Sequence, residues 1–166
     1  MQGPTPQHDD FLRAYDQYAD AIFRHCYYRV YDREKAKELS QECFMKTWEY
    51  LSQGKQVDNL RAFLYRVANN LIIDSSRKKK ESSLDAMMDE GFEPMGAGPE
   101  SATVAAEAGQ MIALIERLDE KYRDAVRMRY LDDLSPKEIA AALGESENVI
   151  SVRIHRGIKQ LREFMA

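Results

Sequence analysis

The chain has 166 residues, of which 44% are apolar and 31% are charged, a balance typical of globular proteins. That length allows one ordinary domain or two small ones, each with a thin hydrophobic core. No apolar run approaches the roughly 20 residues that a membrane-spanning helix needs, and the amino terminus lacks the pattern of a signal peptide. We therefore expect a cytoplasmic protein with no membrane insertion.

The net charge of −4 hides two basic segments on either side of an acidic one. Residues 61–80 include six basic residues and one acidic residue, and residues 153–162 include four basic residues and no acidic one. Between them, residues 81–107 hold seven acids and no base. Since affinity for the phosphate backbone depends on lysine and arginine, the two basic segments are candidate nucleic-acid contacts.

Hydrophobic periodicity predicts three helices in the first half of the chain. The first covers about 10–30, and the second covers about 32–51, with an aspartate at its start that can cap it. A polar loop, 52–59, ends in an asparagine that can cap the third helix, which runs over 60–80 into a basic end. We expect these three helices to share one core.

The acidic stretch that follows contains glycine, proline and serine and lacks helical periodicity, which predicts a flexible linker over 81–100. Helical patterns resume near residue 101 and continue to the end of the chain. The sequence therefore predicts an all-α fold with two small helical modules, 8–80 and 101–166, joined by this linker.

The clearest local signature lies in the second module. Ser135 and Glu138 form a capping box, with Pro136 at the first helical position. Gly144 can end this helix in a left-handed conformation, and Ser146 can cap the next one. Helix, tight turn and helix together indicate a helix-turn-helix, whose second helix enters the major groove. A common helical corner with a solvated basic face is the alternative.

Side chains on the outward side of this last helix are candidate contacts with duplex DNA. Those near its amino end can reach base edges, and the basic residues further along can bind phosphates. The candidates for base edges are Glu147, Asn148, Ser151 and Val152, and those for phosphates are Arg153, Arg156 and Lys159.

The third predicted helix carries amide and basic side chains opposite its apolar stripe. Amides can bond base edges, and a polar loop beside them suits capture of an unpaired base, with Tyr65 or Trp48 as a stacking ring. Cations at a helix carboxyl end also interact favourably with the helix dipole, and a lone tryptophan is more often a core residue, so stabilising roles stay open. The outward candidates are Arg66, Asn69, Asn70, Arg77 and Lys78.

Glutamates run along one flank of the second predicted helix and are interrupted by two lysines. Such a flank is either a solvated face with stabilising pairs four residues apart or a docking surface for a basic partner. The sequence leaves both interpretations open.

Nothing in the chain indicates an enzyme. Its three histidines are scattered, and no nucleophile–base pair, phosphate-binding loop or metal-ligand spacing occurs. Cys26 and Cys43 fall on apolar helix faces, which favours buried thiols over a disulfide or zinc site. We expect no catalytic residue, no metal and no cofactor.

These segments together resemble the sigma-70 family, specifically its extracytoplasmic-function (ECF) group. The segment AKELSQECFMKTWEYL, 36–51, resembles region 2.2, and LRAFLYRVANNLIIDSSRKKK, 60–80, resembles regions 2.3 and 2.4. The segment 117–163 resembles region 4, and the acidic stretch corresponds to the linker that replaces region 3. The order and spacing of the segments carry the resemblance from about 11 to 163.

The resemblance implies a non-catalytic sigma factor that directs promoter-specific transcription initiation. Its first module would bind the beta-prime clamp helices of core RNA polymerase and would open and read the minus-10 element, with the 52–59 loop receiving a flipped base. Its second module would bind the minus-35 element and the beta flap, and an anti-sigma factor is an expected partner. Polymerase docking falls on Glu38, Gln41 and Glu42. Minus-10 contacts fall on Arg66, Asn69, Asn70, Asp74, Arg77 and Lys78.

The last helix departs from the family pattern, which commonly shows Thr-Val-Lys-Ser-Arg where this chain has Val149, Ile150, Ser151, Val152 and Arg153. The lysine that the family would use for a DNA contact is missing. The minus-35 sequence therefore cannot be carried over. The alternative function is a polymerase-independent helix-turn-helix regulator, whose first module serves dimerisation or sensing. Tight binding of the purified protein to a palindromic site would favour that alternative.

Overall fold

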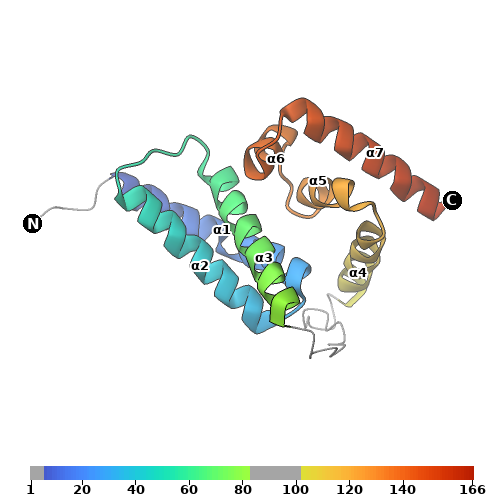
Figure 1. Cartoon of the computed structure of the whole chain (residues 1–166), viewed down its shortest axis with the longest axis horizontal. Coiled ribbons are helices and arrows are strands. Elements are labelled where there is room, and N and C mark those ends of the chain that lie inside the picture. Colours follow the sequence, from blue (N-terminus) through green and yellow to red (C-terminus); the bar gives the residue numbers. More distant parts are fainter. Residues whose placement is uncertain (1–5, 83–101) are drawn as a thin grey trace, which may run out of the picture. The chain divides into compact units, whose positions relative to one another are not determined.

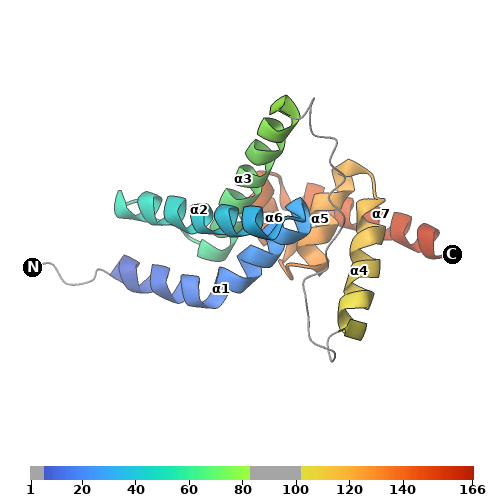
Figure 2. The same ribbon diagram turned by 90° about the horizontal axis from the view of Figure 1, so that it is seen from below.

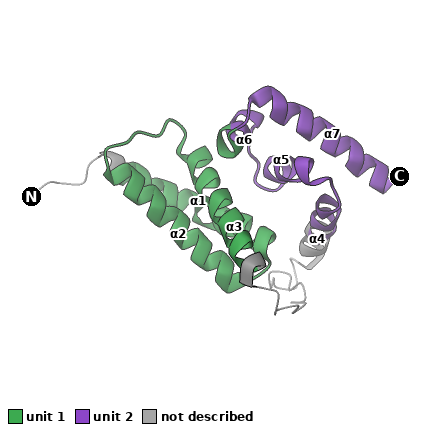
Figure 3. Ribbon diagram, in the orientation of Figure 1, with its two compact units in different colours: residues 1–87, 141–144 green, residues 88–140, 145–166 purple. Residues whose placement is uncertain are grey.

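The computed structural model describes residues 6–82 and 102–166, which form helices joined by short loops and turns and contain no strand. The chain divides into two compact units, one comprising 1–87 with 141–144 and the other comprising 88–140 with 145–166 (Figure 3). The predicted all-α, two-module fold is thus confirmed. The predicted linker lies outside the described residues from residue 83 onward, and its first two residues belong to a helix.

Three helices form the first unit: α1 (Pro6–Val30), α2 (Arg33–Ser52) and α3 (Leu60–Ser82). Each packs against the other two, with α1 and α2 side by side and α3 crossing them (Figure 1 and Figure 2). The buried side chains come from all three helices, so the unit has one shared core, as predicted.

Short polar and left-handed residues set the ends of these helices. Tyr31 adopts a φ of 53°, and its N–H bonds the carbonyl four residues back at 2.8 Å, which closes α1. The Asp32 side chain accepts from the backbone N of Lys35 at 3.1 Å and starts α2. Asn59 caps α3 in the same way, 3.0 Å from the backbone N of Ala62. Both predicted caps are confirmed.

The two cysteines lie in the core of this unit as free thiols, so the prediction of buried thiols is confirmed. The Cys43 Sγ donates to the carbonyl oxygen of Leu64 at 3.2 Å. Burial, together with the neighbouring Cys26, raises the pKa of the Cys43 thiol. A thiol kept protonated is a poor nucleophile, so the pair serves packing.

The second unit contains α4 (Ala102–Glu116), α5 (Glu120–Tyr130), α7 (Glu147–Met165) and the first part of α6 (Pro136–Leu143), whose residues from 141 onward are grouped with the first unit. α5 packs along α7, and α4 contacts both of them. A cluster of apolar side chains from α4, α5 and α7 and their connections joins these elements. The cluster consists of Ile115, Leu118 and Val126, with Leu131, Leu161 and Phe164 packed against it.

The predicted helix-turn-helix caps are present in full. The backbone N–H of Ser135 donates to Glu138 Oε1 at 3.2 Å, and the N–H of Glu138 donates to Ser135 Oγ at 3.1 Å. Gly144 has a φ of 69°, the left-handed conformation that a glycine tolerates best. The Ser146 hydroxyl then accepts from the N–H of Val149 at 3.1 Å, so α7 begins where the sequence predicted.

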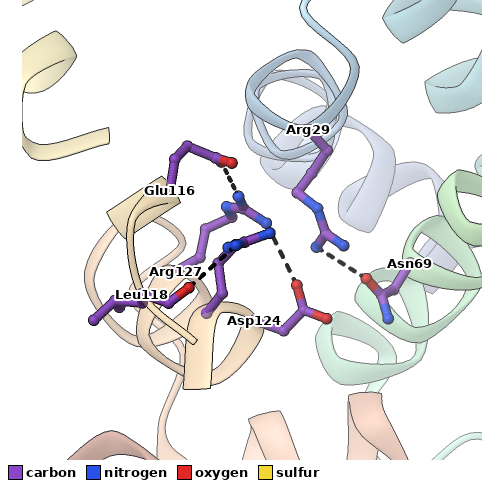
Figure 4. A network of polar contacts seen from close by, with 7 residues as sticks. Arg29, Asn69, Glu116, Leu118, Asp124 and Arg127 are labelled. Carbon is purple, nitrogen blue, oxygen red and sulfur yellow. Dashed lines mark hydrogen bonds and ion pairs between the residues drawn. The ribbon is translucent and has the colours of Figure 1, made fainter. Parts of the chain in front are cut away.

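Polar contacts hold α4, α5 and α7 together around this core. The buried guanidinium of Arg127 is paired with Glu116, at the end of α4, and with Asp124 on its own helix (Figure 4). Asp119 exchanges two hydrogen bonds with the Gln160 side chain, at 3.2 and 2.9 Å. Since a buried charge is tolerated only when paired, Arg127 ties the α4–α5 corner into one geometry.

α5 and α7 approach closely at Gly157, which suggests a test of the packing. A Cβ at this position would lie inside van der Waals contact of Val126 Cγ2 and 3.3 Å from Tyr122 Cβ. We expect Gly157→Ala to lower the free energy of unfolding of the second unit by about 1–3 kcal/mol through overpacking. Faster hydrogen exchange of the α5 and α7 amides would measure it.

Gly109 of α4 offers a matched control, because a Cβ there meets nothing within 4 Å. Gly109→Ala should therefore stabilise α4 by about 0.5–1 kcal/mol through helix propensity. Equal effects of the two substitutions would contradict the close contact at Gly157.

Candidate nucleic-acid and protein-docking surfaces

The outward side of α7 forms a continuous exposed surface, which we call the recognition face. Its residues recur at helical spacing from the first turn of α7 to its middle, while Ile150 and Ile154 are buried on the other side. The predicted outward orientation of these side chains is confirmed. The recognition face consists of Glu147, Asn148, Ser151, Val152, His155, Arg156 and Lys159.

Arg153 differs from the other predicted phosphate contacts. It is half-buried, and its Nη2 donates to Glu145 Oε1 at 3.3 Å. Glu145 belongs to the turn before α7, so the guanidinium reaches back to the amino end of the helix. Helical spacing alone groups Arg153 with the basic residues further along α7 and does not indicate Glu145, because their contact depends on how the turn folds.

The outward side of α3 carries an exposed line that we call the basic line. Its residues stand three or four positions apart, except for an adjacent basic pair at its end, and one acidic residue lies among them. Five of the six candidate minus-10 residues are exposed, which confirms the predicted outward orientation of all of these except Asp74, for which none was predicted. These five are Arg66, Asn70, Asp74, Arg77 and Lys78.

Asn69 does not belong to the basic line. Its side chain is 4% exposed, and Oδ1 accepts a hydrogen bond from Arg29 Nη1 at 3.1 Å (Figure 4). The prediction that this amide faces outward was therefore wrong. α3 packs against two helices and buries a wider arc than a single apolar stripe, and Asn69 falls at the edge of that arc. Arg29, on α1, was missed because the pair spans 40 positions.

The suggested stacking role of Tyr65 was also wrong for this conformation. The ring is 1% exposed and lies edge-on to His25, with centroids 5.1 Å apart. A fully buried ring cannot stack on an incoming base, so Tyr65 is a core residue.

A polar pocket of about 570 Å³ lies beside the predicted base-capture loop. The loop and the first residues of α3 form one wall, and the amino-terminal half of α1 forms the other. Cationic and acidic side chains are mixed in its lining, including Arg13, Lys55, Arg61 and Asp58. The pocket is within the size range of small-molecule sites, so it can admit a single base.

α2 presents an exposed polar surface opposite its buried side. Glu38, Gln41 and Glu42 are all exposed, and Lys35 Nζ lies 3.8 Å from Glu38 Oε2. Leu39 is buried on the other side of the helix. We call the three exposed residues the acidic face, and their predicted outward orientation is confirmed.

An apolar groove of about 570 Å³ continues this surface between α1 and α2. Met45 and Trp48 of α2 are 60% and 36% exposed, and Leu12 and Tyr15 of α1 are 58% and 47% exposed. Trp48 stacks on His8 at 4.4 Å, so this residue lies at the rim rather than in the core. Several large apolar side chains exposed together indicate a protein-binding surface.

The described part of the chain contains no cluster of three or more potential metal ligands. Nor does any of its helices have the length and hydrophobicity needed to cross a bilayer.

Comparison with known proteins accounts for both units. The family model described as "Sigma-70 region 2" matches residues 14–82, and the one described as "Sigma-70, region 4" matches residues 108–161. The "ECF RNA polymerase sigma factor SigW" of Bacillus subtilis is 33% identical over 93% of this chain and 88% of its own. BldN, an ECF RNA polymerase sigma factor of Streptomyces coelicolor, is 29% identical over 95% of this chain and 61% of its own.

A solved structure shares the fold. The sigma factor RpoE from Bartonella quintana, crystallised with the anti-sigma factor NepR, superposes with a TM-score of 0.72. The match covers 95% of this chain and 97% of RpoE at 20% identity. The chain belongs to the ECF group of sigma-70 family RNA polymerase sigma factors, which direct promoter-specific transcription initiation.

The burial of Asn69 predicts different effects for two adjacent asparagines. Asn69→Ala should lower the free energy of unfolding of the first unit by about 1–3 kcal/mol, because Arg29 loses a buried acceptor. Asn70→Ala, at an exposed position, should change it by less than about 0.5 kcal/mol. Denaturant unfolding followed by the fluorescence of Trp48, the one tryptophan in the chain, reports on this unit alone. Equal stabilities of the two variants would contradict a structural role for Asn69.

Proposed function

We propose that this sigma factor uses the acidic face to bind core RNA polymerase, the basic line to open the minus-10 element, and the recognition face to hold the minus-35 duplex. The observation that carries the proposal is the separation of charge within the first unit. Glu38 and Glu42 lie exposed on α2, a helix with four acidic and four basic residues, whereas α3 carries six basic residues and two acidic ones, so one small unit can present carboxylates to a protein and cations to a nucleic acid.

Docking at the acidic face draws on both charge and apolar area. Glu38 and Glu42 stand one helical turn apart on the same side of α2, so both can contact basic side chains of one partner surface, which we assign to the beta-prime clamp helices. The groove lined by Met45 and Trp48 adds apolar contacts to the same surface, and buried aromatic anchors carry much of the affinity at protein interfaces. Charge then sets the orientation and the association rate.

Promoter opening falls to the basic line and the pocket beside the loop. Arg66, Arg77 and Lys78 supply phosphate contacts, and Asn70 offers both a donor and an acceptor to a base edge. A flipped base could enter the pocket between α1 and the loop, where polar side chains surround it. Asn69 acts indirectly, by fixing α3 against α1 through Arg29.

The second unit would hold the minus-35 element through α7. Glu147, Asn148, Ser151 and Val152 stand near the amino end, which is the part of a recognition helix that reaches base edges. Arg156 and Lys159 lie one and two turns further along, at the distance suited to phosphates.

The two modules, 8–80 and 101–166, act together in this proposal, with 81–100 as the linker between them and the beta flap as a second contact on polymerase. Each DNA contact is weak alone, and polymerase sets their spacing, so the free factor should bind promoter DNA poorly. An anti-sigma factor would regulate the protein by covering these surfaces. We further propose that the chain is cytoplasmic and has no catalytic activity of its own.

The docking proposal predicts a loss of polymerase binding on charge reversal. Glu38→Lys with Glu42→Lys should reduce co-purification with core RNA polymerase at least tenfold, because two attractive charges become repulsive. Asp16→Lys with Asp20→Lys repeats the same charge change at the same spacing on exposed positions of α1 and serves as the control. Equal retention of both double variants by polymerase would rule out the acidic face as the docking site.

The opening proposal is tested by transcription in vitro with core polymerase over a genomic template library. The wild-type factor should yield promoter-specific transcripts that core polymerase alone does not produce. Asn70→Ala with Arg77→Ala should reduce promoter opening by about tenfold or more, a loss of two polar contacts, while duplex binding by the holoenzyme changes less. Permanganate reactivity of unpaired thymines measures the opening, and normal reactivity in this variant would contradict the role of the basic line.

A further inference from the structure

The ion pair between Glu145 and Arg153 joins the turn of the helix-turn-helix to the recognition helix. The two side chains are 39% and 31% exposed, and the Nη2–Oε1 distance is 3.3 Å. Exposed pairs of this kind contribute little to stability, typically under about 1 kcal/mol. The effect of the pair on folding is therefore small, and its effect on the charge that α7 presents can be considered separately.

Both ends of the pair are held by the backbone. The N–H of Glu145 donates to the carbonyl of Ala140 at 3.0 Å, immediately after the left-handed Gly144. The next residue, Ser146, caps α7. Arg153 lies on the second turn of α7, beside the buried Ile154. Because neither backbone position is free to shift, the carboxylate is presented to the guanidinium at a fixed place.

The pairing changes what Arg153 can offer to DNA. Side chains on a helix lean toward its amino end, which brings the guanidinium alongside the turn. A guanidinium already neutralised by a carboxylate releases no counterion when a phosphate approaches, so it adds little to the affinity for DNA in general. Arg156 and Lys159 of the recognition face are exposed, and neither forms an ion pair with a carboxylate in the described part of the chain.

We propose that Glu145 is a positioning residue that holds Arg153 off the phosphate backbone and so limits sequence-independent binding by α7. The inference rests on the proposed DNA contact of the recognition face and names a regulation of that contact. Glu145 suppresses the general electrostatic attraction and leaves recognition to the side chains at the amino end of the helix. Discrimination between DNA sequences then rises at the expense of total affinity.

A double-mutant cycle tests this role with the full-length chain. The probe is a duplex of about 30 base pairs of mixed sequence, with binding followed by fluorescence anisotropy between about 50 and 200 mM salt. Glu145→Gln should steepen the slope of log K against log salt by about 0.9, which is one added phosphate contact. Over this fourfold range of salt, the affinity of the variant should fall about 3.5-fold further than that of the wild type.

The other variants separate pairing from simple repulsion. Arg153→Ala alone should leave the slope at the wild-type value, and Arg153→Ala should cancel the effect of Glu145→Gln when the two are combined. Glu163→Gln removes the same charge from an exposed position near the end of α7 and should leave the slope unchanged. The melting temperature should be the same for all four variants, since the pair contributes little to folding.

Two results would overturn the inference. One is a wild-type slope for Glu145→Gln. The other is a steeper slope for Glu145→Gln that persists when Arg153 is replaced by alanine, because the carboxylate would then repel DNA without acting through Arg153. Promoter-directed transcription by the wild-type protein with core polymerase tests the proposed function separately, so failure of the cycle alone leaves that function intact.

Discussion

The packing of α3 against both α1 and α2 determines what the first unit can present to a partner. A helix that packs on one neighbour keeps half of its surface free, whereas α3 packs on two and leaves a narrower exposed strip that contains the basic line. That constraint buries Tyr65 and Asn69 and exposes Asn70, one position along. The same three-helix contact leaves α2 an outward side of its own, so Glu38 and Glu42 are exposed on a different helix from the basic line.

Much of the fold could be predicted because it depends on local chemistry. Caps at Asp32, Asn59 and Ser135 and the glycine stop at Gly144 act through hydrogen bonds within a few residues, and all of them form as expected. Periodicity likewise indicated which sides of α2 and α7 face outward. In an amphipathic helix, the spacing of the apolar residues determines which side is buried, so the sequence predicts which side is exposed.

The predictions that failed involve contacts between distant positions. Whether residue 69 is buried depends on how wide an arc of α3 is covered by α1 and α2 together. The sequence of α3 alone does not determine the width of that arc. The contact between Arg29 and Asn69 forms only when α1 and α3 pack together. The contact between Glu145 and Arg153 depends on how the turn before α7 folds. The site residues therefore divide into those set by one helix and those set by its neighbours.

α7 is one continuous helix with two roles. Its carboxyl half supplies Leu161 and Phe164 to the core, and its amino half carries the residues proposed to read DNA. At 1.5 Å per residue, its 19 residues span about 28 Å without a break. The close contact at Gly157 fixes the rotation of α7 about its own axis against α5. The packing of α7 in the core therefore sets the orientation of its amino half. A substitution in the core can change how the residues proposed to read DNA are oriented, even though it lies far from any DNA base.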